Sequence, residues 1–216
     1  ASSDAEVTVG EGASLADCKI TFDGNDITHL APNKRLHLGL GRSFQVNNLF
    51  WGTTVMMNVI MALYGAENKH IRMFSILEKR PELLAEAERL LKLVDLWDMR
   101  NESPTLLSYG EQRLLELLMA FTAKPKLVLL DEPSAGLPTA EVELFTQRLR
   151  ALAGDTTLLF CAHDMDLVFA LADEIMVLYF GQIIAKGPPK EIASNPKVQE
   201  IYLGGDDDTY DKAHNG

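Results

Sequence analysis

Two adjacent carboxylic acids end an apolar run near the middle of the chain. Asp131 and Glu132 directly follow the run Leu127–Leu130. A short apolar run predicts a buried parallel strand, and ligands of open α/β sheets bind at the carboxyl ends of the strands. At that edge, Asp131 offers the oxygen ligands that Mg²⁺ prefers, and Glu132 can accept a proton from an attacking water molecule. A solvated strand end is the alternative interpretation of the pair.

A histidine follows the next apolar run. His163 comes directly after Thr156–Ala162, so we expect it at the same sheet edge as the two carboxylates. There it can donate a hydrogen bond to charge that develops on a phosphate. A histidine after a strand is commonly structural, and the expected proximity to Asp131 and Glu132 is what favours a functional role.

Serine, glycine and glutamate stand together at the start of an apolar helix. Ser108–Glu111 precedes Leu114–Thr122, which fits a capping box with Ser108 as the N-cap. It also fits an anion site, because a hydroxyl, a glycine backbone and a helix N-terminus all favour a phosphate. The two interpretations are compatible. Gln45, after Gly41–Phe44, adds an amide oxygen that can ligate Mg²⁺ where the sheet gives way to helices.

The elements that must position these residues follow from hydrophobic periodicity. The predicted strands are Lys126–Asp131, Thr156–Ala162, Glu174–Phe180 and Ile183–Ala185, and the predicted helices are Pro81–Trp97, Arg113–Thr122, Thr139–Leu152 and Met165–Ala172. Strands that alternate with helices indicate an α/β fold with a parallel sheet covered on both faces. Residues 58–122 show no strand pattern, so we expect a helical lobe to interrupt the sheet.

Composition limits the class of protein. The 216 residues include 20 Lys+Arg and 31 Asp+Glu, which gives a net charge of −11. Because phosphate contacts need clustered positive charge, this excess argues against a nucleic-acid partner. No apolar stretch approaches the roughly 18 to 20 residues of a membrane-spanning helix. The two cysteines, Cys18 and Cys161, favour a reducing compartment, and Cys161 is expected in the core because it lies in an apolar run.

The motifs taken together resemble those of one family, the ABC ATPases. Phe44-Gln45 resembles the Q-loop, and Leu107–Gln112 resembles the signature motif. Leu127–Pro133 resembles the Walker B motif, and Ser134–Leu137, which follows it, resembles the D-loop. His163 resembles the H-loop, and the order and spacing of all five motifs match those of the family. The match runs from Ile20 to Gly205. This resemblance implies a P-loop NTPase-like (RecA-like) parallel sheet with an inserted α-helical subdomain.

Within the family, four segments are similar to the ATPase subunit of branched-chain amino acid importers: Phe22–Gly24, Ser43–Phe50, His163–Phe169 and Asn195–Gly204. The resemblance implies that residues 1–44 and 121–189 form the RecA-like core, 45–120 the helical subdomain and 190–216 a C-terminal tail. It also implies ATP and Mg²⁺ as cofactors, with a second ATPase subunit and membrane permease subunits as partners. The chain would lie on the cytoplasmic face of the cell membrane, and Gln45–Leu63 with the helical lobe would contact the permease.

The resemblance also assigns a role to each site residue. Glu132 and His163 would be catalytic, as the general base and as a contact of the γ-phosphate. Asp131 and Gln45 would ligate Mg²⁺, and Gln45 would also contact the nucleotide. The signature residues would bind ATP held by the opposing subunit: Ser108, Tyr109, Gly110, Glu111 and Gln112.

One family motif has no counterpart in the sequence. A phosphate-binding loop needs G-x-x-x-x-G-K-[ST], whose backbone N–H groups cradle phosphates, but no Gly-Lys pair occurs in the 216 residues. Gly10–Ser14 lacks both the lysine and the spacing. The family pattern would put the loop at or just before Ala1, so we expect the N-terminal part of the core to be incomplete and the isolated chain to be inactive.

Three functions are compatible with these patterns. The first is the energy-coupling ATPase subunit of an importer for branched-chain or related amino acids. The second is a non-hydrolysing or truncated partner subunit that contributes only its signature face to another chain's ATP site, which the missing loop favours. The third is a DNA-repair ABC ATPase, which the acidic charge and the importer-like ending disfavour.

Overall fold

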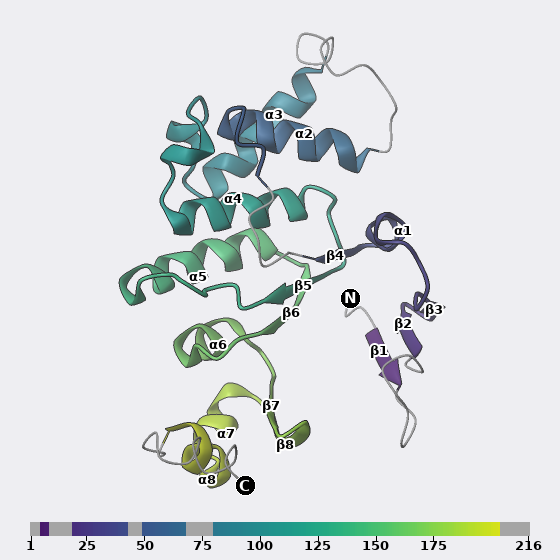
Figure 1. Ribbon diagram of the computed structural model, residues 1–216, viewed down its shortest axis with the longest axis vertical. Helices are drawn as coiled ribbons and strands as arrows, with labels where there is room; N and C mark the ends of the chain where they lie inside the picture. Colours follow the sequence, from purple (N-terminus) through teal and green to yellow (C-terminus); the bar gives the residue numbers. More distant parts are fainter. Residues whose placement is uncertain (1–4, 9–18, 43–48, 68–79, 204–216) are drawn as a thin grey trace, which may run out of the picture. The chain divides into compact units, whose positions relative to one another are not determined.

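The computed structural model describes residues 5–8, 19–42, 49–67 and 80–203, and Figure 1 shows their helices and strands. The chain forms two compact units, one that ends at His163 and one that begins at Asp164. All described residues to which the sequence assigns chemistry belong to the first unit.

The first unit contains a parallel sheet with the strand order β4–β5–β6. The strands are β4 (Leu40–Arg42), β5 (Leu127–Asp131) and β6 (Thr157–Cys161). Helix α5 (Thr139–Ala153) connects β5 to β6, and the register places Asp131 opposite Cys161. The α/β fold class and the two longer strands are confirmed. Strand β4 was not predicted, because three residues are too few to show a period.

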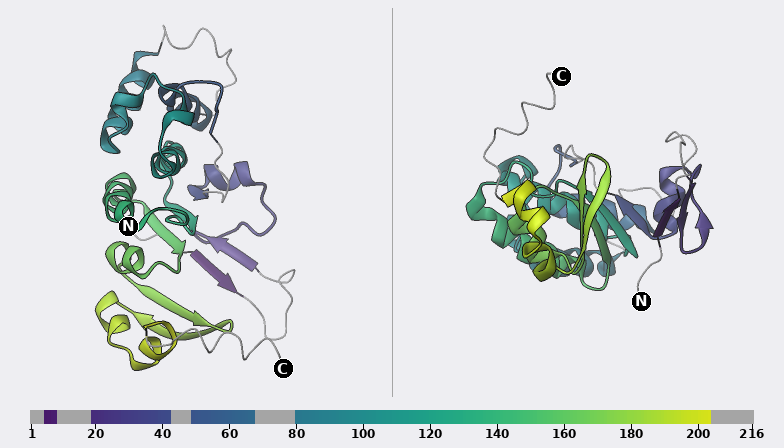
Figure 2. Two further views of the ribbon diagram at one scale, coloured as in Figure 1. Left: turned by 60° about the vertical axis from the view of Figure 1, so that its left-hand side comes forward. Right: turned by 90° about the horizontal axis from the view of Figure 1, so that it is seen from below.

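The helical lobe consists of α2 (Val55–Ala66), α3 (Pro81–Leu93) and α4 (Tyr109–Phe121), with the 3₁₀ turns η3 (Trp97–Met99) and η4 (Pro104–Leu106). Helix α4 packs against both α2 and α5, as Figures 1 and 2 show. Its buried leucines, Leu114, Leu115, Leu117 and Leu118, join the lobe to the rest of the unit. The described part of residues 58–122 contains helices and turns without a strand, as the sequence predicted.

An antiparallel sheet precedes the parallel one in the chain. It has the order β1 (Ala5–Thr8), β2 (Lys19–Phe22) and β3 (Asn25–Asp26), and α1 (Pro32–His37) follows it. Buried Phe22 and Ile27 pack with Leu127 at the start of β5. This shared apolar cluster attaches the antiparallel sheet to the parallel sheet.

The second unit begins with α6 (Met165–Leu171), whose N-cap Asp164 accepts hydrogen bonds from the amides of Asp166 and Leu167. It continues with β7 (Ile175–Tyr179), β8 (Gln182–Gly187), α7 (Pro189–Ala193), α8 (Pro196–Val198) and the π-helix η5 (Gln199–Leu203). The sequence predicted the third apolar run as part of the parallel sheet. Among the described strands β7 pairs only with β8, which is antiparallel to it, and Phe180 and Gly181 adopt the positive φ angles of the tight hairpin that joins the two predicted strands. Among the described helices, none is both long and apolar enough to cross a membrane.

Strand β6 is more exposed than its apolar sequence predicted. Among the described strands it pairs only with β5, and Cys161 is exposed rather than buried in the core. Leu159 exposes 58% of its surface. The expectation for Cys161 was wrong because composition predicts a buried strand, whereas burial also requires a neighbour that covers it.

The side of β6 on which no described strand pairs leads to a prediction about association. An exposed apolar edge strand is a template for pairing with another chain, and a charged side chain on it opposes that pairing. We therefore expect Leu159→Lys to lower the self-association of the chain, as measured by light scattering over a concentration series. Leu144→Lys is the control, since Leu144 is also exposed but lies on helix α5. Equal association of the two variants, or a wild-type chain that stays monomeric, would count against this role of β6.

Candidate functional site

The carboxyl end of β5 presents two acids in different backbone conformations. Asp131 ends the strand and its side chain is exposed, whereas Glu132 is partly buried and has a φ of 45°. A left-handed conformation costs a residue with a side chain about 1–3 kcal/mol and persists only where its surroundings impose it. Here the Glu132 amide donates a 2.9 Å hydrogen bond to the carbonyl of Cys161 on β6. The turn after β5 is therefore held by the neighbouring strand.

Glu132 and His163 meet at this edge, as their sequence positions predicted. His163 Nδ1 lies 2.9 Å from Glu132 Oε2, which forms an ion pair when the imidazole is protonated. Oε2 is shielded from solvent and has no hydrogen-bond partner in the described structure. The His163 side chain is 81% exposed. Glu132 therefore has one shielded oxygen beside an imidazole that faces solvent, while 33% of its side chain is exposed.

The N-terminus of α4 forms the predicted capping box. The Glu111 amide donates to Ser108 Oγ at 3.3 Å, and the Ser108 amide donates to Glu111 Oε2 at 2.8 Å. Gln112 adds a 3.0 Å bond from its side-chain amide to the Leu107 carbonyl. Because Ser108 uses its oxygen as an acceptor here, its hydroxyl proton remains suited to donation. The cap and an anion contact at exposed Ser108 are therefore compatible.

The capping box packs against the segment Ser134–Leu137. Gly136 has a φ of 81°, and a Cβ built on it would lie 3.2 Å from Cε1 of Tyr109. A Cβ on Gly110 would lie 3.1 Å from Leu137 Cδ2. The sequence did not predict this proximity, because it depends on how the start of α4 packs against Ser134–Leu137, where Gly136 faces Tyr109 and Gly110 faces Leu137.

Gly136→Ala is expected to destabilise the chain by about 1–2 kcal/mol, because alanine is strained at this φ and its methyl group would press on the Tyr109 ring. The free energy of unfolding in urea measures the effect. Gly65→Ala is the matched control: Gly65 lies exposed in α2 with nothing near its Cβ direction. Gly65→Ala should stabilise the folded chain by about 0.5–1 kcal/mol, because alanine loses less backbone entropy than glycine when a helix forms. A Gly136→Ala chain as stable as the wild type would contradict this prediction, because it would show that the Tyr109 ring can move away from the added methyl group at little cost.

One residue near the site was missed by sequence reasoning. Arg113 was taken only as the start of an apolar helix, but its guanidinium is buried and lies 2.7 Å from Glu116 Oε2. Its Nη2 donates to the backbone carbonyl of Asp131 at 3.4 Å. The available signal was the arginine at the start of an apolar helix. Because a buried charge needs partners, its position could have predicted a buried contact.

The donor set fits a magnesium ion only together with a phosphate ligand. The described residues contain no group of three or more His, Cys, Asp or Glu side chains that could enclose a metal. Mg²⁺ in proteins is usually held by one or two carboxylates plus water and substrate phosphates. Exposed Asp131 matches that pattern. Gln45, the other predicted Mg²⁺ and nucleotide contact, lies outside the described residues.

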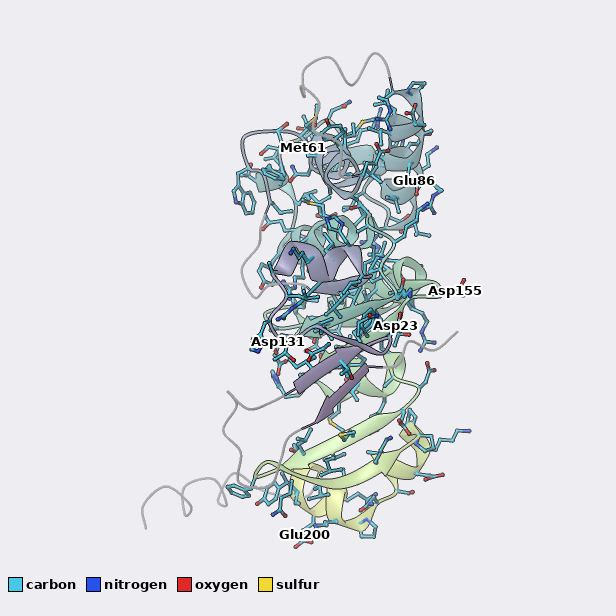
Figure 3. The ribbon with its side chains drawn as sticks, turned by 90° about the vertical axis from the view of Figure 1, so that its right-hand side faces the viewer. Asp23, Met61, Glu86, Asp131, Asp155 and Glu200 are labelled. Carbon is cyan, nitrogen blue, oxygen red and sulfur yellow. The ribbon has the colours of Figure 1, made fainter. Side chains whose placement is uncertain are left out.

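A separate cavity of about 650 Å³ lies at the amino ends of β5 and β6. Among its charged lining residues, Arg89 is paired with Glu86 at 2.9 Å, and this hydrogen bond lowers the pKa of Glu86 below its ordinary value. In Figure 3, Asp155 of this cavity and Asp131 lie on opposite sides of the first unit. The cavity is therefore not part of the carboxyl-edge site.

Comparison with known proteins adds independent findings. A family model described as "ABC transporter" matches residues 12–135, and one described as "Branched-chain amino acid ATP-binding cassette transporter" matches residues 182–208. The probable branched-chain amino acid transport ATP-binding protein LivG of Archaeoglobus fulgidus is 33% identical over 195 residues, covering 88% of this chain and 75% of the relative. The high-affinity branched-chain amino acid transport ATP-binding protein BraF of Pseudomonas aeruginosa is 33% identical over 194 residues, covering 86% and 75%.

Two solved structures of ATP-binding cassettes are also similar to this chain. One structure of an ATP-binding cassette of an ABC transporter superposes with a TM-score of 0.69 at 28% identity, covering 87% of this chain and 78% of that chain. The ADP conformation of such a cassette gives a TM-score of 0.68 at 28% identity, covering 88% and 78%.

Proposed function

Since the chain belongs to the ABC transporter family of ATP-binding proteins, we propose that it is the ATP-hydrolysing subunit of an importer for branched-chain or related amino acids. The observation that carries the proposal is the pairing of Glu132 with His163 at the carboxyl edge of the parallel sheet. The match of residues 182–208 and the names of the relatives support the substrate class. They give no support to a subunit that contributes only a signature face.

In the proposed mechanism, Glu132 takes a proton from the water molecule that attacks the terminal phosphate of ATP. The Glu132 side chain is 33% exposed, so water can reach the carboxylate, while its Oε2 lies 2.9 Å from the imidazole of His163. His163, exposed beside it, donates a hydrogen bond to the terminal phosphate.

Asp131 would hold Mg²⁺, with Gln45 as a second oxygen ligand. The ion would neutralise negative charge on the phosphates during transfer. Asp131 suits this role because its carboxylate is exposed at the sheet edge, directly before the base.

We assign the capping-box residues to a second nucleotide. Ser108 and Gly110, with Tyr109, Glu111 and Gln112, would contact ATP held by a second ATPase subunit. A hydroxyl donor and a helix N-terminus at an exposed position favour the phosphates of such a ligand. Two subunits in this arrangement would complete each other's sites.

We further propose that the helical lobe contacts membrane permease subunits on the cytoplasmic face of the membrane. Phe50 and Trp51 are exposed by 51% and 43%, which suits contact with an apolar partner. Asn58 is fully buried and holds this segment, since its side chain accepts from the Phe50 amide at 2.8 Å and donates to the Phe50 carbonyl at 3.1 Å. The net charge of −11 argues against nucleic acid as a partner.

Transport by vesicles tests the proposal. Permease subunits and a second ATPase subunit that carries the complete phosphate-binding loop would be reconstituted with and without this chain, and uptake of radiolabelled leucine would be measured with Mg-ATP supplied on the cytoplasmic side. We expect ATP-dependent uptake only with the chain present, and loss of uptake with Trp51→Ala if the lobe contacts the permease. Uptake that does not require the chain, or ATP hydrolysis that leucine transport does not accompany, would contradict the proposed function.

A further inference from the structure

Arg113 joins the signature helix to the carboxyl edge of the sheet. It lies in the first half of α4, whose N-terminus carries the capping box, and only 4% of its surface is exposed. Its guanidinium contacts Glu116 on the same helix and the Asp131 carbonyl on β5. A guanidinium has donors in a fixed planar fork, so it can bind two acceptors in one defined orientation.

The carbonyl that Arg113 contacts belongs to the peptide between Asp131 and Glu132. The same peptide carries the Glu132 N–H, which donates to the carbonyl of Cys161 at 2.9 Å. In a planar trans peptide the C=O and the N–H point in opposite directions. The Asp131–Glu132 peptide is therefore held at both ends, by the helix on one side and by β6 on the other.

Fixing this peptide sets the direction of both acids. Rotation of the plane would change ψ of Asp131 and φ of Glu132 together, and Glu132 is already in the left-handed region at 45°. A conformation of that kind persists only where the surroundings impose it. Two hydrogen bonds on one peptide supply the constraint.

We infer that Arg113 is a positioning residue, which holds the Asp131–Glu132 peptide and so links the place of the signature helix to the orientation of the catalytic base. The inference deepens the proposed function and rests on it for the role of Glu132. Arg113 is buried and acts through the backbone of Asp131, without contact with the substrate. A displacement of α4 would therefore change the orientation of Asp131 at the end of β5 and of Glu132 after it.

The test removes the charged pair without leaving a buried charge behind. Replacing both partners of a buried ion pair by apolar residues is often neutral or stabilising, so the chain carrying Arg113→Met with Glu116→Leu should fold. We expect hydrogen–deuterium exchange of the Glu132 amide in the full chain to accelerate about tenfold or more, the factor expected when one charge-assisted hydrogen bond is lost. Exchange in α2 and the melting temperature should stay close to those of the wild type.

Arg89→Met with Glu86→Leu is the matched control, because it removes an exposed Arg–Glu pair with the same spacing on α3. It should leave the Glu132 amide unchanged. Unchanged exchange at Glu132 in the Arg113 variant would overturn the inference, and so would acceleration spread evenly over the whole unit, which indicates a general effect on stability. Should the double variant not fold, Arg113→Lys replaces it: faster exchange at Glu132 supports the inference, and wild-type exchange overturns it.

Turnover separates this inference from the proposed function. In an assembly that hydrolyses Mg-ATP, we expect the Arg113 double variant to lower kcat by about tenfold with little change in KM, since only the orientation of the base is disturbed. If the wild-type assembly does not hydrolyse ATP, the proposed function fails, while the exchange measurement still decides whether Arg113 holds the peptide.

Discussion

Glu132→Gln is expected to lower ATP turnover by about 10²- to 10⁴-fold in an assembly where this chain supplies the general base. The amide keeps the size of the side chain but cannot take a proton from water. Glu132 has the required placement, because it directly follows the last residue of β5 and its Oε2 lies beside His163. Phosphate release at saturating Mg-ATP, compared between variant and wild type, measures the loss.

Glu143→Gln provides the control for this change. Glu143 lies exposed on α5, where Gln147 contacts it at 3.3 Å, and surface substitutions of this kind usually change stability by no more than about 0.5 kcal/mol. Turnover of this variant should therefore match the wild type. A Glu132→Gln assembly that keeps more than about a tenth of wild-type turnover would remove Glu132 from the role of general base.

The sequence predicted the parts of the site that depend on local pattern. The apolar run before Asp131 predicted a strand that ends at the acids, and β5 ends at Asp131. The spacing of Ser108 and Glu111 predicted the capping box, because a cap is made by residues close in sequence. The proximity of His163 to Glu132 followed from a rule of sheet topology, that parallel strands present their carboxyl ends at one edge.

Contacts between distant segments could not be predicted in this way. Arg113 and Asp131 are 18 residues apart, and their hydrogen bond depends on how α4 packs on the sheet. The approach of Tyr109 to Gly136 depends on the same packing. Hydrophobic periodicity states which face of a helix is buried, but it does not state which atoms the buried face meets.

Burial of the strands was only partly predictable for a related reason. The apolar sequence of β6 predicted a strand covered on both faces, and the same argument applied to β5. In the structure β5 has a neighbour on each side and its Val128 is fully buried, whereas β6 has a described neighbour on one side and exposes Leu159. Sequence composition reports the preference of a strand for burial, whereas the burial of each side chain also depends on what covers its face of the sheet, and in β6 the exposed residues alternate along one face.

The chain of 216 residues by itself is expected to bind Mg-ATP weakly and not to turn it over. Its sequence contains no Gly-Lys pair and hence no G-x-x-x-x-G-K-[ST] loop, so the lysine and the backbone donors that cradle phosphates are missing from it. Charge-assisted hydrogen bonds contribute about 1.5–3 kcal/mol each. Losing two or three of them lowers affinity by about 10²- to 10⁶-fold.

Calorimetry with Mg-ATP on the isolated chain measures this affinity, with an ATP-binding cassette that carries the complete loop as the positive control. Asp131, Glu132 and His163 cannot compensate, because carboxylates repel the phosphates unless Mg²⁺ intervenes, and Mg²⁺ relies on those same phosphates to complete its coordination. Weak binding by a folded chain would support the prediction. It would show that the general base and the capping box can form in a chain that lacks the phosphate-binding loop. Micromolar binding with steady hydrolysis would instead mean that residues other than a G-x-x-x-x-G-K-[ST] loop hold the phosphates in this chain.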